Sequence, residues 1–276
     1  MRQTYDLTVA SLKMLLRDRT ALLGAAIFPV LFLLVFSLYD LSITPIGDLG
    51  VAGSVPGLDY FDFVLPGMLA MGLMNFTMVG IAGSVARFRE TKVLRRLTAA
   101  PVSPSAFIAG QVLARLVVAL VQVLLLLGFG VALGGTVTGN PLWLLVLATL
   151  GNLTFLAFGF AIAGRAPSVD AANNLAGLAT MPLMFLSGMF FPLASLPGGI
   201  QRVAEVLPIT PLVDAMRAVS LHGATPGELT VELAWLAAWV PISFVVARLA
   251  FRMDTVRPTR RRRARVGEPE PANSPA

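Results

Sequence analysis

The sequence predicts an all-α integral membrane protein, because it is poor in charge and carries six long apolar runs. Of its 276 residues, 56% are hydrophobic and 13% are charged, whereas a soluble domain carries about 25% charged residues. The mean hydropathy is +0.79. Each run is long enough to cross about 30 Å of hydrocarbon as a helix that rises about 1.5 Å per residue. The six predicted transmembrane helices cover residues 20–39, 63–86, 109–133, 141–163, 171–191 and 229–251.

The N-terminal segment predicts an interfacial amphipathic helix that lies on the membrane surface. Its apolar residues recur at helical spacing beside charged ones, and they are Tyr5, Val9, Leu12 and Leu16. A basic start before an apolar run also fits a signal peptide. The run 20–39 is longer than the core of a signal peptide, however, and has no small-x-small cleavage site. We therefore expect it to be retained as the first span.

The distribution of basic residues predicts the topology. Of the 21 lysines and arginines, eighteen fall in segments that six spans would place on the side of the N-terminus, and two fall on the other side. Cytoplasmic loops are enriched in lysine and arginine, so both termini are expected in the cytoplasm. Because the basic residues flank apolar runs, the formal charge of +6 indicates membrane orientation and not a nucleic-acid partner. Residues 1–255 then form one transmembrane domain, and residues 256–276 a disordered basic cytoplasmic tail beside anionic lipid.

Residues 192–228 predict a re-entrant external hairpin between the fifth and sixth spans. Two apolar patterns at i, i+3, i+4 and i+7 are separated by Pro208 and Pro211. A helix of about ten residues is only about 15 Å long, which is too short to span a membrane. The two patterns consist of Ile200, Val203, Ala204 and Leu207, and of Leu212, Ala215, Met216 and Val219.

Several kinds of chemistry are missing from the sequence. It contains no G-x-x-x-x-G-K-[ST] phosphate loop, no H-E-x-x-H, no G-x-S-x-G and no cysteine, and His222 is its one histidine. These absences predict a non-catalytic chain without a metal or a bound cofactor. No pair of acids lies inside a span, which weakens the class of proton-coupled transporters. Arg115 alone approaches a span interior, and we expect it to snorkel to the inner interface; a functional intramembrane charge is the alternative.

Four uncharged polar residues inside the spans are candidates for a substrate path: Asn75, Gln122, Asn152 and Asn174. Two interpretations fit them. They can form hydrogen bonds between helices, each contributing about 0.6 to 2 kcal/mol, or a subset of them can line the path of a substrate.

The basic loop after the second span predicts a docking helix. On a helix with about 100° per residue, residues 89–100 place their basic side chains on one side and Val93, Leu94 and Leu97 on the other. Glu90 falls within the apolar side. A helix with this pattern can rest on lipid, but a carboxylate in its apolar face fits a protein groove that carries a cation better. We therefore favour docking on a protein.

Two stretches carry a resemblance to a known family. The run RETKVLRRLTAAPVSPSAFIAGQVL, residues 89–113, resembles the cytoplasmic coupling segment of the permeases of type-2 ATP-binding-cassette exporters. The run LSGMFFPLASLPGGIQRVAEVLPITPLVDAMRAV, residues 186–219, is similar to that family's fifth span and external hairpin. The order of elements also matches over about residues 1–255, and the drug and antibiotic exporters typified by daunorubicin resistance permeases are the most similar branch.

The resemblance implies a transmembrane subunit that moves a drug, antibiotic, lipid or other amphipathic compound out across the bacterial cytoplasmic membrane. Such permeases form homodimers, or heterodimers with a similar permease, and pair with two copies of a separate ATPase that binds ATP and Mg. The implied coupling helix contains Glu90, Val93, Leu94, Leu97 and Pro101. An autonomous secondary transporter or channel, and a membrane accessory or assembly protein, are the alternative functions.

Overall fold

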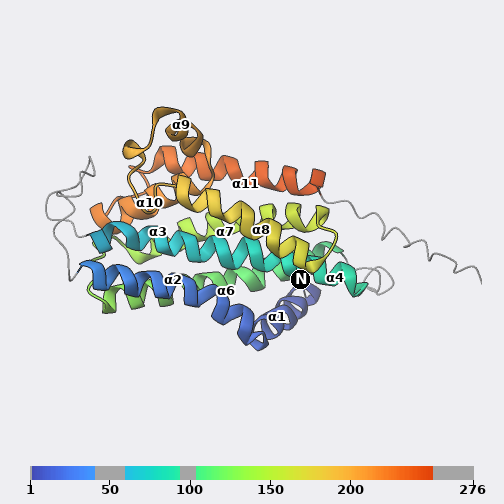
Figure 1. Ribbon diagram of the computed structural model, residues 1–276. Coiled ribbons are helices and arrows are strands. Elements are labelled where there is room, and N and C mark those ends of the chain that lie inside the picture. The colour runs from blue at the N-terminus through green and yellow to red at the C-terminus, as the bar shows by residue number, and fades with distance from the viewer. Residues whose placement is uncertain (1, 41–59, 94–103, 251–276) are drawn as a thin grey trace, which may run out of the picture.

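The apolar runs of the sequence form helices that pack side by side in a computed structural model, which describes residues 2–40, 60–93 and 104–250 (Figure 1). Every regular element in these three ranges is helical. The α-helices are α1 (Arg2–Arg17), α2 (Arg19–Asp40), α3 (Tyr60–Met74), α4 (Gly80–Glu90), α6 (Pro104–Ala132), α7 (Pro141–Arg165), α8 (Val169–Leu186), α9 (Gly198–Val206), α10 (Ile209–His222) and α11 (Thr230–Ala250). A π-helix, η2 (Asn75–Val79), joins α3 to α4, and a 3-10 helix, η3 (Leu193–Ser195), precedes α9.

Four helical segments of the described chain are long and apolar enough to cross a membrane. They are Tyr60–Glu90, which combines α3, η2 and α4, and then Ala106–Ala132, Pro141–Arg165 and Thr230–Ala250. A fifth follows if α1 and α2, which are inclined by 72°, count as one bent span. The predicted first and fifth spans correspond to α2 and α8. Asp170, Asn173 and Asn174 make the first turns of α8 more polar than the other spans, and the six-span topology stays a prediction.

The helix formed by the fifth apolar run ends earlier than the sequence predicts. Residues up to 191 are apolar, but α8 ends at Leu186. Gly188 has a φ of +73°, which glycine adopts without the steric cost that a side chain adds. The hydroxyl of Ser187 donates to the carbonyl oxygen of Met184 at 2.9 Å. The chain therefore leaves the helix at Ser187 and turns towards η3.

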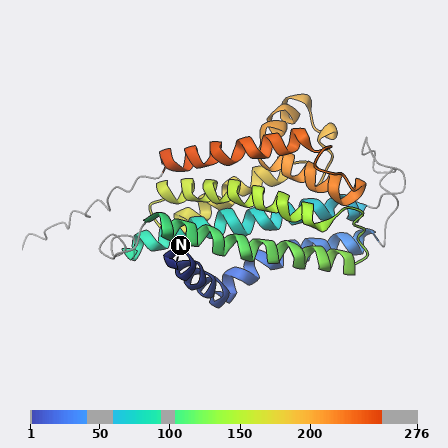
Figure 2. The same ribbon diagram turned by 180° about the vertical axis from the view of Figure 1, so that it is seen from behind.

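The segment from Tyr60 to Glu90 lies at the centre of the bundle. Its neighbours are α2, α6, α7, α8 and α10, and Figures 1 and 2 show it surrounded from both sides. The main apolar cluster gathers around it and includes Met68, Met71 and Met74 with Phe155 of α7. We refer to this segment as the central span.

Close contact between α7 and the central span depends on glycine. A Cβ atom at Gly159 would overlap the side chain of Ile81 and would lie 2.6 Å from the carbonyl oxygen of Met78. At Gly151 a Cβ atom would lie 3.1 Å from a methyl group of Leu73 in the central span. Small residues let membrane helices approach closely, and dispersion forces then hold them together.

The helix α1 packs against the first turns of α6. The amide of Gln111 donates to the hydroxyl of Ser11 at 3.1 Å, and a Cβ atom at Gly110 would lie 3.0 Å from Cβ of Leu7. Of the four predicted interfacial residues, Val9 and Leu12 are half-buried, whereas Tyr5 and Leu16 are 69% and 55% exposed. The sequence pattern did not indicate Ser11 as a packing residue, because the pattern counts apolar residues and the serine side chain is small and polar.

The segment predicted as a hairpin contains two short helices, α9 and α10, separated at Leu207 and Pro208. All four residues of the second apolar pattern are buried in α10. In α9, Ala204 is buried while Ile200 and Val203 are exposed. The chain leaves α10 at Gly223, whose φ is +64°. The predicted re-entrant position in a membrane stays a prediction.

Candidate functional site

The residues of the predicted coupling segment follow the end of α4. Glu90 is the last residue of that helix, and Val93 is the last described residue before position 104. The predicted coupling residues Leu94, Leu97 and Pro101 lie outside the described residues. The structure therefore places the start of this segment at the tip of the central span.

The prediction of one helix from Arg89 to Ala100 is wrong at its beginning. Arg89 and Glu90 belong to α4, and the chain turns at Thr91 and Lys92. The hydroxyl of Thr91 donates to the carbonyl oxygen of Arg87 at 2.7 Å, and Lys92 has a φ of 57° in the left-handed region. A helical projection is valid only for an unbroken α-helix. Because the chain turns at Thr91 and Lys92, Glu90 does not share a helix face with the residues that follow.

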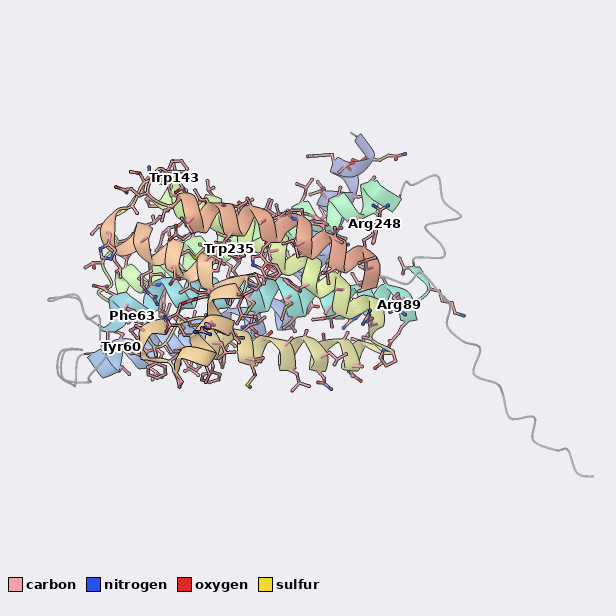
Figure 3. The ribbon with its side chains drawn as sticks, turned by 90° about the horizontal axis from the view of Figure 1, so that it is seen from above. Tyr60, Phe63, Arg89, Trp143, Trp235 and Arg248 are labelled. Carbon is pink, nitrogen blue, oxygen red and sulfur yellow. The ribbon has the colours of Figure 1, made fainter. Side chains whose placement is uncertain are left out.

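Arg89 and Glu90 instead hold the turn between α7 and α8. A guanidinium nitrogen of Arg89, Nη1, donates to the carbonyl oxygen of Ala163 at 2.6 Å and to that of Ala166 at 3.2 Å. Oε1 of Glu90 accepts a hydrogen bond from the backbone N–H of Val169 at 2.8 Å. We call this set of contacts the α4 clasp. Figure 3 labels Arg89 at the same end of the bundle as Arg248.

Arg115 does not snorkel towards the end of the bundle, contrary to the prediction. Arg115 is 1% exposed. Its Nη2 donates to the carbonyl oxygen of Gly80 at 2.9 Å and to the hydroxyl of Ser84 at 2.6 Å. A Cβ atom at Gly80 would lie 2.8 Å from Nη1 of Arg115. The absence of a side chain at Gly80 thus makes room for a guanidinium between α6 and α4.

The four candidate path residues lie on different helices, and the structure gives no single lining formed by all of them. Asn75 donates to the carbonyl oxygen of Met71 in its own span at 3.2 Å, and Gln122 is buried on α6. Asn152 is 0% exposed on α7, and its amide has no hydrogen-bond partner among the described residues. Asn174 is exposed on α8. A substrate path through these residues stays a prediction.

The opposite end of the central span is fixed by Arg217 of α10, which the sequence showed only as an external charge. Its side chain donates to the carbonyl oxygens of Phe63 at 3.3 Å and of Gly188 at 3.0 Å. The guanidinium carbon lies 3.8 Å from the centroid of the Phe63 ring, which is a cation–π contact. Asp214, one turn earlier, lies 3.6 Å from Nη1. Figure 3 labels Tyr60, Phe63 and Trp143 at this end.

We expect Arg217→Ala to lower the free energy of unfolding by about 2 kcal/mol, because two hydrogen bonds from a charged donor and the ring contact disappear together. Arg202→Ala is the matched control: Arg202 is exposed in the preceding helix, and exposed substitutions usually change stability by less than about 0.5 kcal/mol. Thermal unfolding of both purified variants in detergent measures the difference. Equal midpoints for the two variants would show that the Arg217 contacts do not stabilise the fold.

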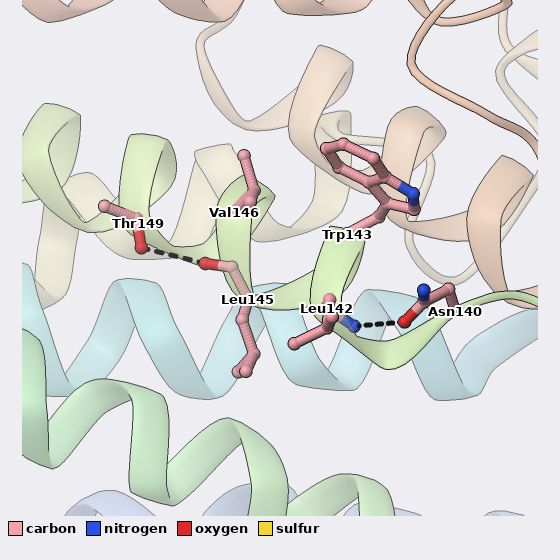
Figure 4. Close-up of a pocket in the computed structure, with 6 residues that line it drawn as sticks. All are labelled: Asn140, Leu142, Trp143, Leu145, Val146 and Thr149. Carbon is pink, nitrogen blue, oxygen red and sulfur yellow. Dashed lines mark hydrogen bonds between the residues drawn. The ribbon is translucent and has the colours of Figure 1, made fainter.

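A shallow hollow of about 420 Å³ lies at the beginning of α7 (Figure 4). Two of its polar oxygens are already engaged: the side-chain oxygen of Asn140 accepts a hydrogen bond from the N–H of Leu142, and the hydroxyl of Thr149 donates to the carbonyl oxygen of Leu145. Leu142 and Val146 are exposed beside them. The lining is therefore apolar and suited to lipid. No group of three metal-ligating acids or histidines occurs within the described parts of the chain.

Apolar helices of membrane-spanning length, with Arg89 and Arg217 bonded at opposite ends of the central span, define the chain as a multi-pass helical membrane protein. Its sequence matches the ABC-2 type transporter family over residues 2–221. The chain belongs to this family and is a transmembrane component of a transporter.

Several named proteins are similar to this chain. The probable doxorubicin resistance ABC transporter permease protein DrrC of Mycobacterium tuberculosis is 25% identical over 243 residues, which cover 86% of this chain and 83% of DrrC. Nodulation protein J of Rhizobium meliloti is 28% identical over 73% of this chain and 77% of its own length. The probable multidrug ABC transporter permease YbhR of Escherichia coli is 26% identical over 70% of this chain and 51% of its own length.

Proposed function

We propose that this chain is the permease subunit of an ATP-driven exporter that moves a drug, antibiotic, lipid or other amphipathic compound out across a bacterial cytoplasmic membrane. The observation that carries the proposal is the family match over residues 2–221. Relatives named for doxorubicin resistance and multidrug transport support the substrate class. Apolar spans suit a compound that itself partitions into lipid.

The energy source in this proposal is a separate ATPase subunit, present in two copies, that binds ATP and Mg. The sequence has no phosphate loop, so the family role requires hydrolysis on a partner. The part of the coupling segment beyond the turn, residues 93–101, docks on that partner through its apolar residues, which are Val93, Leu94, Leu97 and Pro101. Hydrolysis on the partner moves this segment, and a binding event changes the equilibrium only where its contacts differ between two states.

The membrane arrangement completes the proposal. The helices α2 and α8 join the four long apolar segments to give six spans, with both termini in the cytoplasm, as the basic residues indicate. Two permeases, either copies of this chain or this chain and a similar one, form the transport unit.

Leu97→Asp tests the coupling role. We expect this variant to reach the membrane. The amount of ATPase that co-purifies with it should be about tenfold or more below that of the wild type, because burying an unpaired carboxylate in a docking groove costs several kcal/mol. The control is Arg96→Gln, which changes the net charge by the same amount on the basic side of the segment. It should retain the ATPase.

Reconstitution into vesicles tests the class of function. The proposal predicts ATP-dependent transport only when the purified ATPase is added to the permease. Transport by the permease alone would contradict it and would favour an autonomous transporter or channel. If Leu97→Asp and the wild type recovered equal amounts of ATPase, the coupling segment would not be the docking site.

A further inference from the structure

We propose that α4 and α8 move as one rigid unit during transport, and that Glu90 is the positioning residue that passes movement of the coupling segment to α8. The inference rests on the proposed function and assigns a role to the α4 clasp, which no sequence pattern indicated. Three observations support it: the seam between the two helices, the chemistry of the clasp, and the contacts at the two ends of α8.

The seam between α4 and α8 is made of very small residues. Five buried alanines form one cluster, and they are Ala82, Ala86, Ala166, Ala172 and Ala176. Next to them, a Cβ atom at Gly83 would overlap Oδ1 of Asn173. Helices whose facing residues are alanine and glycine approach closely along their length. The side chain of Asn173 lies directly against Gly83, and Val169 packs against the alanine cluster, so the two helices fit together along this seam.

The clasp satisfies two helix ends at once. The first N–H groups of a helix have no partner within it. In α8, the side chain of Ser168 accepts from Ala171 N at 3.1 Å, and Glu90 accepts from Val169 N. A carboxylate at a helix N-terminus also interacts favourably with the helix dipole, as a guanidinium does at a C-terminus. Arg89 occupies that second position at the end of α7.

The clasp lies where movement of the coupling segment must enter the bundle. Only Thr91 and Lys92 separate Glu90 from Val93, the first residue of that segment beyond the turn. At the other end of the same pair of spans, Arg217 joins the carbonyl oxygen of Gly188, just after α8, to that of Phe63 in α3. The central span and α8 are therefore connected at both ends. On its remaining side α8 exposes Leu178 and Met181, so those residues leave α8 free to follow α4.

The first experiment compares Glu90→Ala with Glu90→Gln in vesicles that contain the permease and its ATPase. The alanine variant should still bind the ATPase and hydrolyse ATP, but the number of molecules exported per ATP should fall about fivefold or more, the lower range of allosteric coupling. The glutamine side chain retains an oxygen that accepts from Val169 N, so this variant should keep the export ratio. A residue with only a structural role would lower permease yield and leave the ratio unchanged.

The second experiment replaces the clasp by a covalent bond. The sequence contains no cysteine, so Gly83→Cys with Asn173→Cys introduces one defined pair, and a Cβ atom at position 83 would lie 3.2 Å from Cγ of Asn173. Cγ of Asn173 lies about where Sγ of a cysteine at position 173 would lie, so the two positions are close enough for a disulfide, whose Cβ atoms are about 3.5–4.5 Å apart. Oxidation should leave export intact in the otherwise wild-type protein and should restore the export ratio of Glu90→Ala. The reduced double-cysteine variant is the control.

Four outcomes would overturn the proposal. Export that stops when the disulfide forms and returns on reduction would show that α4 and α8 must separate. An unchanged export ratio in Glu90→Ala would show that the clasp transmits nothing. Loss of ATPase binding in that variant would make Glu90 a docking residue. Failure of the wild type to bind an ATPase or to export with one would overturn the proposed function as well, and the control measurement on the wild type identifies that case.

Discussion

Replacement of Gly159 by valine is expected to lower the free energy of unfolding by about 3 kcal/mol, the upper range for overpacking a filled core. A side chain at this position would overlap Ile81 and approach the carbonyl oxygen of Met78. The backbone atoms of the central span cannot move aside without breaking helical hydrogen bonds, so the cost falls on the packing of α7. Resistance to unfolding in mixtures of detergent and sodium dodecyl sulfate measures the change.

Gly128→Val is the matched control for Gly159→Val. Gly128 also lies within a long apolar helix, but nothing lies within 4 Å of a Cβ atom built there. Valine forms helices better than glycine, so this variant should be as stable as the wild type or slightly more stable. If both variants lost the same stability, the effect would come from valine in a helix and not from the contact between α7 and the central span.

Asp62→Ala should lower the free energy of unfolding by about 2 to 3 kcal/mol, because two hydrogen bonds to a charged group disappear. Asp62 is 7% exposed. Its two carboxylate oxygens accept from the backbone N–H of Thr136 at 2.7 Å and from the hydroxyl of Thr136 at 2.6 Å. These bonds fix the turn between α6 and α7 to the first turn of the central span.

Asp62→Asn separates geometry from charge at this position. An asparagine oxygen can still accept from the N–H of Thr136, and its amide can donate to the hydroxyl, so this variant should lose less than half of the stability lost by alanine. Chemical denaturation of the purified variants, followed by tryptophan fluorescence, provides the comparison. An asparagine variant as unstable as the alanine variant would assign the effect to the charge of Asp62 alone.

Local patterns in the sequence predict much of the helical structure. The apolar runs correspond to helices, and the period of Leu212, Ala215, Met216 and Val219 predicts the buried face of α10. Both signals depend on residues within a few turns of one another. The contact between Asp62 and Thr136 joins residues far apart in the chain, and the same is true of Glu90 and Val169. No spacing rule within one helix can reveal such pairs.

Arg115 and Glu90 show where the site predictions failed. Snorkelling was expected for Arg115 because its long side chain can reach an interface, but a carbonyl oxygen and a hydroxyl on α4 offer partners at its own depth. The helical projection placed Glu90 on a docking face, but the turn at Thr91 and Lys92 interrupts the helix. In both cases a tertiary contact or a break in the helix determines the position of a charged side chain. The periodicity of apolar residues in the sequence indicates neither feature.

The π-helix from Asn75 to Val79 determines how α4 is rotated relative to α3 within the central span. A π-turn holds one more residue than an α-turn, so it rotates the segment after it by about 100° relative to an uninterrupted helix. The first half, α3, packs on α2 and α10, while the second half, α4, packs on α7 and α8. The insertion therefore fixes the angle between the packing faces of the two halves. Deletion of any one of these five residues would restore a regular helix and turn Glu90 away from Val169, so the length of this stretch is fixed more strictly than the identity of its residues.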